Sequence, residues 1–262
     1  MDRKVLVAAL LVVAFLAVGF AGCTGSEETP AAAGATEEKT YIVGVDGDYK
    51  PYSYIDEAGN PTGFDVDSIQ WIADEMGFKV TVQPMAWDGI IPALRAGNID
   101  MVYSGMTITE DRKKVVSFSD VYWVVNQSVT VRNGSEYTMD DFMNGTIIMG
   151  AQRGSTAAMW LEDNLVKTEI LPEDNLKLYD NFPLAVTDLL NERIDGAMYD
   201  TPIVLDAIEG KPLKQLGQIN TGEEYGIAVR QDDTELLETL NTGLNKLMDS
   251  PKWDELKEKY GM

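Results

Sequence analysis

The side chains best placed for chemistry stand in short turns between apolar segments. Arg112 follows a Thr-Ile-Thr turn, and its guanidinium can hold a carboxylate through two parallel hydrogen bonds. Ser155 and Thr156 follow Gly154 in a strand-to-helix turn, where backbone amides at the start of a helix bind anions. Plainer explanations exist, because an Arg is usually a surface residue and a Ser often caps a helix. On the residues alone, the surface explanation is the better one for Arg112 and the two explanations are equal for Ser155, so these turns are candidates for an anion site and do not identify one.

Two aspartates end apolar segments that are predicted to be strands. Asp46 follows the segment 41–45, and it could equally be a turn-forming residue. Asp200 follows the segment 196–199, and it could cap a helix that is expected to begin near Thr201. Both carboxylates are therefore available for a site, but neither identifies one by itself.

The composition excludes several kinds of site. The 262-residue chain has no histidine, so Ser-His and Cys-His nucleophilic machinery and His-ligated zinc are impossible. A single cysteine, Cys23, leaves no partner for a disulfide. The formal net charge of −22 argues against nucleic acid and anionic lipid as partners. We therefore expect no metal, no cofactor and no nucleic-acid partner.

The elements that must position these residues alternate between strands and helices. Residues 41–45 and 79–83 have the apolar pattern of strands, whereas apolar residues from Phe64 to Met76 recur at helical spacing and stop at Gly77. This alternation predicts an α/β fold with mainly parallel sheets. Later elements are expected as helices at 90–94, 236–248 and 252–260 and as strands at 100–103 and 225–229.

The segments 93–105 and 188–200 are similar to each other. Each begins in a predicted helix, passes a polar break and an Ile-Asp pair, and continues as a short apolar strand into a polar turn. Ligands bind beyond the carboxyl ends of strands in open α/β sheets. The similarity predicts two related lobes that each bring one turn to a ligand, although so short a match could also arise by chance.

The N-terminus has the organisation of an export signal. Arg3 and Lys4 precede a mostly apolar run over 5–22, and Cys23 follows it directly. A lone cysteine at this point resembles the lipobox of bacterial and archaeal lipoproteins, which implies that 1–22 is a cleaved signal peptide and that Cys23 is lipidated. The run could also stay as an uncleaved membrane helix. The small, polar and acidic segment 23–40 is predicted to be a flexible tether.

Several groups of residues follow one another in a characteristic order: Gly63–Asp67, Trp87–Leu94, Ser104–Lys114 with Phe118–Asp120, Tyr199–Pro202 and Tyr225–Ala228. Together they resemble the family 3 solute-binding proteins, which are polar amino-acid receptors of ABC importers. The resemblance implies a two-lobed periplasmic-binding-protein type II fold, in which two crossover strands join lobes made of a mostly parallel sheet and flanking helices. The implied boundaries are lobe 1 at 41–121 and 226–262, lobe 2 at 127–221, and the hinge at 122–126 and 222–225.

The ligand of such a receptor is a free amino acid, whose two opposite charges need an anion and a cation in the site. The resemblance assigns Arg112 to the ligand carboxylate and Asp200 to its ammonium group. Further polar groups are expected to complete these contacts: Ser104, Gly105, Thr107, Ser155 and Thr156.

The ligand side chain is expected to meet Asp46, Tyr49, Trp87 and Gln152. The two aromatic residues match a pair that sandwiches the ligand in the family, and such rings attract a desolvated cation by roughly 0.5–2 kcal/mol; the plainer alternative is that they are core residues. Some glutamine receptors have lysine at the position of Gln152. The amide here leaves Asp46 without that cation, and an unpaired buried carboxylate is costly. A basic ligand (arginine, lysine or histidine) is therefore expected, with glutamine as the alternative.

The chain is thus expected to be a monomeric binding protein and not an enzyme, held at the outer face of the cytoplasmic membrane by Cys23 and read by the membrane subunits of an ABC permease. Some relatives look like cyclohexadienyl dehydratases or peptidoglycan lyases, and for such an enzyme Asp46 is the candidate acid. A sensor domain would have to act through another protein, because the chain ends at Met262. Sequons begin at Asn126, Asn133 and Asn144, and matter only in a host that glycosylates exported proteins.

Overall fold

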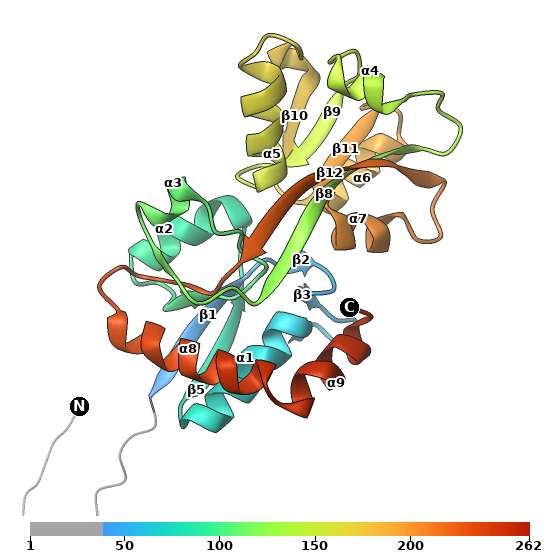
Figure 1. Cartoon of the computed structure of the whole chain (residues 1–262). Coiled ribbons are helices and arrows are strands. Elements are labelled where there is room, and N and C mark those ends of the chain that lie inside the picture. The colour runs from blue at the N-terminus through green and yellow to red at the C-terminus, as the bar shows by residue number, and fades with distance from the viewer. Residues whose placement is uncertain (1–38) are drawn as a thin grey trace, which may run out of the picture. The chain divides into compact units, whose positions relative to one another are not determined.

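The computed structural model describes residues 39–262, which form two lobes, each built on a five-stranded sheet (Figure 1). In the sheet of lobe 1, strand β13 is antiparallel to both of its neighbours, so the other four strands share one direction. The strand order is β5 (Lys79–Pro84), β1 (Thr40–Val45), β6 (Met101–Val102), β13 (Ala228–Val229) and β7 (Ser117–Phe118).

The sheet of lobe 2 repeats this plan. Strand β8 is antiparallel to both of its neighbours, and the other four strands again share one direction. The strand order is β10 (Leu176–Tyr179), β9 (Met149–Gln152), β11 (Gly196–Asp200), β8 (Trp123–Arg132) and β12 (Leu213–Tyr225). The predicted α/β fold with two mostly parallel sheets is confirmed.

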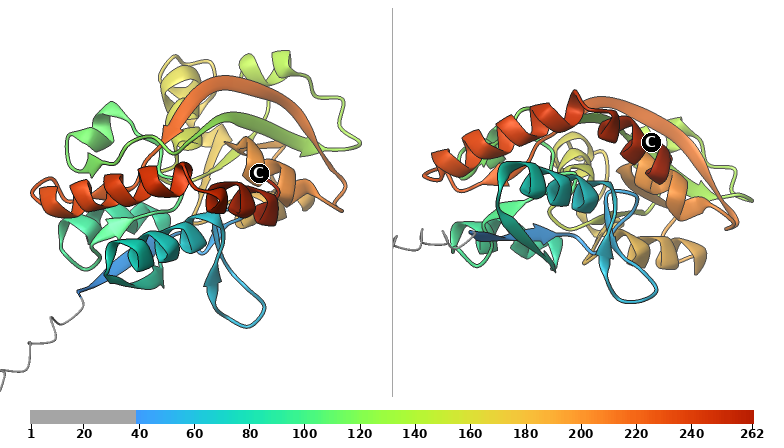
Figure 2. Two further views of the ribbon diagram at one scale, coloured as in Figure 1. Left: turned by 60° about the horizontal axis from the view of Figure 1, so that its bottom comes forward. Right: turned by 90° about the horizontal axis from the view of Figure 1, so that it is seen from below.

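Helix α1 (Phe64–Met76) shows how local sequence sets the elements of lobe 1. It buries Phe64, Ile69 and Ile72, which recur on one face, and it ends because Gly77 adopts a left-handed conformation with φ 76°. Helices α8 (Thr234–Met248) and α9 (Pro251–Tyr260) pack beside it (Figure 2). All three helices were expected close to these bounds.

The remaining elements are short. The other helices are α2 (Ile90–Arg95), α3 (Glu110–Lys113), α4 (Met139–Met143), α5 (Thr156–Leu161), α6 (Phe182–Leu190) and α7 (Thr201–Ile208). Single turns of tighter or wider helix cover Trp87–Gly89, Glu162–Val166 and Glu173–Asn175. A small antiparallel sheet comprises β2 (Asp48–Tyr49), β3 (Ser53–Ile55) and β4 (Pro61–Thr62).

Strands β8 and β12 are the two connections between the lobes, and they run side by side in Figure 1. Their antiparallel pairing starts at Trp123 opposite Tyr225 and reaches Arg132 opposite Leu213 in lobe 2. The register shifts between Ile219 and Glu223, so the ladder is irregular where the chain enters lobe 1. The predicted hinge at 122–126 and 222–225 falls at this end, and its role in movement stays a prediction.

Three predictions differ from the structure in detail. The strand expected at 225–229 is wrong as one element, because Tyr225 ends β12 opposite Trp123, and β13 begins only at Ala228 after the chain turns. Strand β6 is shorter than 100–103. Thr40 already belongs to β1, so the tether predicted at 23–40 ends earlier. The predicted signal peptide, Cys23 and the tether up to residue 38 lie outside the described residues.

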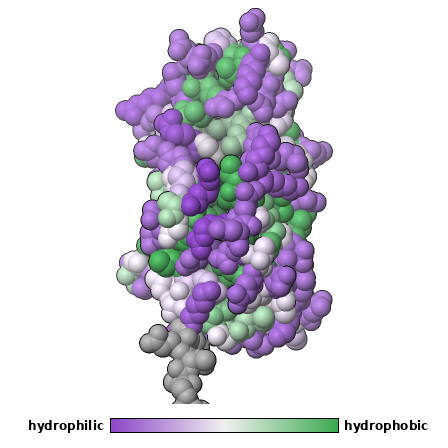
Figure 3. All heavy atoms as spheres, turned by 90° about the vertical axis from the view of Figure 1, so that its left-hand side faces the viewer, coloured by the Kyte–Doolittle hydropathy of each residue, from purple (hydrophilic) through white to green (hydrophobic). Residues whose placement is uncertain are grey.

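Hydrophilic residues cover most of the face shown in Figure 3. Within residues 39–262, none of the helices combines the length and apolar character that crossing a bilayer requires.

Candidate functional site

The two similar segments of the sequence lead to corresponding places in the two sheets. Strands β6 and β11 are each the middle strand of five. The turn Ser104-Gly105 follows β6, and Asp200 ends β11. Tyr49 of lobe 1 donates a hydrogen bond from its hydroxyl to the Asp200 carboxylate of lobe 2, so residues from both lobes meet.

A small enclosed cavity lies at this meeting point. Its volume is about 10 Å³, roughly what one water molecule needs and far less than an amino acid fills. The side chains around it must therefore move apart to admit a ligand. Its lining is Tyr49, Trp87, Gly105, Thr107, Arg112, Ser155, Thr156, Tyr199 and Asp200, which includes eight predicted site residues. The other three, Asp46, Ser104 and Gln152, are buried but do not line it.

Arg112 is the only Lys or Arg side chain that is buried in the part of the chain that the structure describes, with 4% of its surface exposed. Its Nη1 donates to the carbonyl oxygen of Thr107 at 2.7 Å, whereas its Nε is buried without a partner. Burial lowers the pKa of the guanidinium, and the charges of Glu223 and Asp200 oppose this effect. An arginine remains charged under these conditions. The site thus holds a cation that pairs with no carboxylate among residues 39–262.

The carbonyl oxygen of Gly154 joins the two lobes through two residues that line this cavity. It accepts hydrogen bonds from Nη2 of Arg112 at 3.2 Å and from Nε1 of Trp87 at 3.1 Å. The guanidinium also lies 5.5 Å from the centre of the Trp87 ring, within the range of cation–π attraction. Both donors belong to lobe 1, and Gly154 belongs to lobe 2.

Asp200 is the buried carboxylate of lobe 2. It stands at the N-cap position of α7, but its side chain caps no backbone amide there. Instead it accepts hydrogen bonds from the Tyr49 hydroxyl and the Gln127 amide. Burial and the negative charge of Glu223 raise the pKa of Asp200 to about 7, although bonds from Tyr49, Tyr225 and Gln127 pull it down. The alternative interpretation of Asp200 as a helix cap is therefore wrong for its side chain.

Asp46 lies at the other end of the site, on the carboxyl end of β1. Its carboxylate accepts a hydrogen bond from Nε2 of Gln152 at 2.8 Å and another from the backbone amide of Asp48 at 2.9 Å. Burial raises the pKa of Asp46, and these two bonds oppose the shift. The side-chain oxygen Oε1 of Gln152 accepts in turn a hydrogen bond from the Tyr199 hydroxyl. The expected contact between Asp46 and Gln152 is present, and it contains no cation.

Two predicted site residues, Ser104 and Ser155, make hydrogen bonds that stabilise the fold around the cavity. The Ser104 hydroxyl accepts from the backbone amide of Asp46 at 2.9 Å and pairs with the Ser53 hydroxyl at 2.7 Å, so it ties β6 to β1. The Ser155 hydroxyl accepts from the amide of Ala158 at 3.1 Å and caps α5, as its alternative interpretation stated. Both hydroxyls are therefore used within the fold, and of the two residues only Ser155 also lines the cavity.

The turn at Gly105 depends on a buried carboxylate behind it. Gly105 has φ 55°, and a Cβ atom there would lie 2.3 Å from the Tyr49 ring, so only glycine fits. Its amide donates to Asp65 at 2.7 Å, and the Tyr122 hydroxyl donates to the same oxygen at 2.9 Å. Burial raises the pKa of Asp65 to about 8, and the bonds from Tyr122 and Gly105 only partly offset this.

The raised pKa of Asp65 predicts a pH dependence of stability. An unfolded Asp loses its proton near pH 4, whereas folded Asp65 keeps it until about pH 8. Between these values the folded protein binds the extra proton, so the free energy of unfolding falls as pH rises, by up to about 1.4 kcal/mol per pH unit. Asp65→Asn keeps an acceptor but does not titrate. Urea unfolding between pH 5 and 8 should show a shallower slope for this variant.

Asp74, on the exposed side of the same helix, supplies the matched control. Asp74→Asn should keep the wild-type slope, because its carboxylate is exposed in the folded state. Equal slopes for Asp65→Asn and the wild type would contradict the assignment of a buried, protonated Asp65.

Sequence reasoning missed three polar residues at the site. Tyr199 lines the cavity, Gln127 of β8 bonds Asp200, and Glu223 of β12 accepts from Thr107 and Thr156. Tyr199 stood in a quoted motif beside Asp200, so a signal existed for it. No group of three or more His, Cys, Asp or Glu side chains in residues 39–262 is arranged to hold a metal ion.

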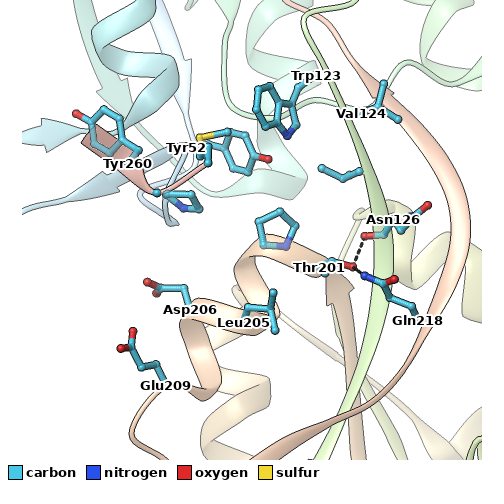
Figure 4. A pocket seen from close by; sticks show the side chains of 15 residues that line it. Tyr52, Trp123, Val124, Asn126, Thr201, Leu205, Asp206, Glu209, Gln218 and Tyr260 are labelled. Carbon is cyan, nitrogen blue, oxygen red and sulfur yellow. Dashed lines mark hydrogen bonds between the residues drawn. The ribbon is translucent and has the colours of Figure 1, made fainter. Parts of the chain in front are cut away.

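A wider groove of about 700 Å³ lies elsewhere between the lobes (Figure 4). Tyr52, Trp123 and Tyr260 face it from one side, and Leu205 of α7 faces it from the other. None of the predicted ligand-binding residues lines it. The enclosed cavity is therefore the better candidate for the site despite its small volume, because the buried charges converge there.

Comparison with known proteins agrees with this geometry. The model of the bacterial extracellular solute-binding proteins, family 3, matches residues 41–262. The chain belongs to this family. The relatives of this family 3 protein are amino-acid-binding proteins of ABC transporters, and its lobes have the type II periplasmic-binding fold.

Three relatives show how far the similarity extends. A "Probable histidine-binding protein" of Neisseria gonorrhoeae is 32% identical over 99% of this chain and 96% of its own length. An "ABC transporter arginine-binding protein 1" of Escherichia coli is 31% identical over 87% and 93%. The solved structure of an ancestral arginine-binding protein bound to arginine has 36% identity and a TM-score of 0.78, and the match covers 85% of this chain and 98% of that one.

Proposed function

We propose that this family 3 protein is the receptor of an ABC importer for a free amino acid with a cationic side chain. The observation that carries the proposal is the charge set between the lobes: one buried guanidinium, Arg112, and two buried carboxylates, Asp46 and Asp200. An amino acid with a basic side chain brings one negative and two positive charges. Such a ligand therefore supplies a partner of opposite charge for each of the three buried groups.

In the proposed complex, Arg112 holds the ligand carboxylate. Its Nε has no partner among the described residues, and Nη1 and Nη2 make one bond each, so N–H groups of the guanidinium remain to donate to a carboxylate. Asp200 and the Gly105 carbonyl receive the ammonium group. Thr107, Ser155 and Thr156 supply polar contacts around these two charges.

The ligand enters when the lobes separate at the hinge predicted at 122–126 and 222–225. The cavity of about 10 Å³ admits no amino acid while the lobes are in this arrangement. The Tyr49–Asp200 and Gln152–Asp46 bonds both run between lobes, so opening breaks them and exposes the charged groups. Closure around a ligand is a known class of switch.

The basic ligand is favoured by the surroundings of Asp46. Only neutral groups bond its carboxylate, and burial raises its pKa. A guanidinium or ammonium group would pair with that carboxylate, and Tyr49 and Trp87 would flank it with aromatic surface. Glutamine is the alternative ligand, because its amide can also bond Asp46 and Gln152.

A stability screen against the proteinogenic amino acids tests the proposal. Binding only to the folded protein raises the melting temperature, and the shift grows with ligand concentration over Kd. Arginine, lysine or histidine should give the largest shifts, and glutamine a smaller one. Stabilisation by aspartate or leucine alone, without a response to basic amino acids or glutamine, would refute the proposed ligand class.

An enzyme similar to cyclohexadienyl dehydratase is the second candidate. The observation in its favour is Asp46, a buried carboxyl group of raised pKa that could hold a proton as an acid. The direct bond from Gln152 favours a binding role instead, because an acid must face the substrate. Turnover of a cyclohexadienyl acid by the purified protein would decide for the enzyme.

The proposal includes export and anchoring. In this proposal Cys23, at the lipobox-like end of the apolar run, carries a lipid, and the predicted tether links it to the lobes at the outer face of the membrane. Mass measurement of the mature N-terminus from the membrane fraction checks this part, since an unlipidated or uncleaved N-terminus would contradict it. The loaded receptor then delivers its ligand to the permease subunits as a monomer.

A further inference from the structure

Glu223 has an unusual set of hydrogen-bond partners for a residue in a connecting strand. Its Oε2 accepts from the Thr107 hydroxyl at 2.8 Å and from the Thr156 hydroxyl at 2.6 Å. Its Oε1 accepts from Nε2 of Gln127 at 2.9 Å. The side chain is half-buried, and no Lys or Arg in the described chain forms an ion pair with it.

These partners belong to different lobes. Thr107 follows the ligand-binding turn of lobe 1, whereas Thr156 begins α5 of lobe 2. Gln127 lies opposite Asp200 in the sheet of lobe 2. One carboxylate therefore connects a hydroxyl of lobe 1 with a hydroxyl and an amide of lobe 2.

The backbone around Glu223 is fixed to lobe 1. The amide of Ile108 donates to the carbonyl oxygen of Glu224 at 2.8 Å, and the amide of Gly226 donates to that of Met106 at 3.1 Å. Thr107 and Tyr225 form a bridge between these two bonds. Because lobe 1 holds the strand here, separation of the lobes should break the bond to Thr156 of α5 and leave the bond to Thr107. Gln127 belongs to β8, which pairs with β12 from Val125 opposite Glu223, so Thr156 is the partner across the cleft.

We propose that Glu223 is a positioning residue for ligand binding, which holds the Thr107 and Thr156 hydroxyls in place and stabilises the closed form of the receptor. This inference rests on the proposed function, since Thr107 and Thr156 are there taken as ligand contacts. The carboxylate does not line the enclosed cavity. Its effect comes from a bond that exists only when the lobes are together.

A bond made only in the closed form affects the dissociation rate constant of the ligand more than its association rate constant. The amino acid meets an open cleft, in which Glu223 has lost its bond to Thr156, so the association rate constant should not depend on this residue. Dissociation begins from the closed form and must break that bond. Hydrogen bonds to a charged group contribute enough for about a tenfold change in a rate constant.

Stopped-flow fluorescence with L-arginine measures both rate constants, because Trp87 lies at the cavity. Glu223→Gln keeps the size of the side chain but loses its charge. The new NH2 group then faces one of the groups that donated a hydrogen bond to the carboxylate. Glu223→Ala removes the acceptor altogether. Both variants should release arginine about tenfold faster and bind it with an association rate constant within twofold of the wild type.

Glu224 provides the matched control. It is the next residue, its side chain is exposed, and only its backbone takes part in the pairing with Ile108. Glu224→Gln and Glu224→Ala change the net charge by the same amount and should keep wild-type release. Melting temperatures of all four variants without ligand show whether faster release is accompanied by a loss of fold stability, and those of the two Glu224 variants should match the wild type.

The outcomes are distinct. Faster release in Glu223→Ala alone supports the proposal and shows that an acceptor oxygen suffices without the charge. Wild-type release in both Glu223 variants overturns it, and so does a slower association with unchanged release. A wild-type protein that binds no amino acid would refute the proposed function itself, whereas a binding wild type with unaffected Glu223 variants would refute only the role of Glu223.

Discussion

Replacing Arg112 with alanine should weaken binding of the amino acid by about 2–5 kcal/mol, which is roughly thirty- to several thousandfold in Kd. The physical reason is that the ligand carboxylate would be enclosed without its cation, and no other Lys or Arg in residues 39–262 is buried. Loss of the partner costs more than the bonds alone, because the remaining charge stays desolvated. Isothermal titration calorimetry at neutral pH measures the effect.

Lys113 gives a matched control for the Arg112 variant. It is the next residue in α3, but it is exposed and pairs with Glu110 at 2.9 Å on the surface. Such a pair contributes little, so Lys113→Ala should bind within about twofold of the wild type. Equal binding by Arg112→Ala and the wild type would show that the ligand carboxylate lies elsewhere.

Replacing Asp200 with asparagine should weaken binding by a similar amount and remove much of its pH dependence. The ammonium group requires the ionised carboxylate, and the pKa of Asp200 in the structure is raised to about 7. Below that pH the wild type must release a proton before it binds, so its affinity should fall by up to about tenfold per pH unit. Asparagine carries no proton to release.

Arginine is the suitable probe for the Asp200 variant, because its guanidinium and ammonium groups keep their charges between pH 5.5 and 8. Calorimetry over this range should give a falling affinity for the wild type toward low pH and a flatter, weaker profile for Asp200→Asn. A wild-type affinity that is constant over the range would contradict the raised pKa, and a steep profile in the variant would assign the titration to another group.

The stability of the ligand-free protein should move in the opposite direction. A folded pKa above the unfolded value means that Asp200 favours the folded state most at low pH, and this contribution is lost as pH rises from about 4 to about 7. Low pH thus protonates Asp200, which weakens ligand binding. The same protonation makes the burial of this side chain less costly in the ligand-free protein.

Local patterns in the sequence were sufficient for the elements that depend on nearby residues. Helix α1 follows from the spacing between Phe64 and Met76 and from Gly77, which all act within one segment. The placement of Arg112 and Asp200 together came instead from the family resemblance. Nothing in their own neighbourhoods shows that residues so far apart in the chain meet.

The missed residues show where a single sequence gives too little information. Gln127 and Glu223 reach the site only because β8 pairs with β12 and because 106–108 pairs with 224–226. Each pairing joins segments about a hundred residues apart. Tyr199 lies in β11, whose residues are buried throughout, so no alternation of polar and apolar residues indicated which side chains face the ligand.

The hydrogen bonds at the Gly154 carbonyl have a consequence for unloading. Arg112 grips the ligand in the proposed complex and also bonds this oxygen of the opposite lobe, as Trp87 does. In the proposed function, a permease that separates the lobes from outside would therefore act directly on the residue that binds the ligand. The separating force would act on the outer surface of the lobes. It would nevertheless weaken the buried pair between Arg112 and the ligand carboxylate.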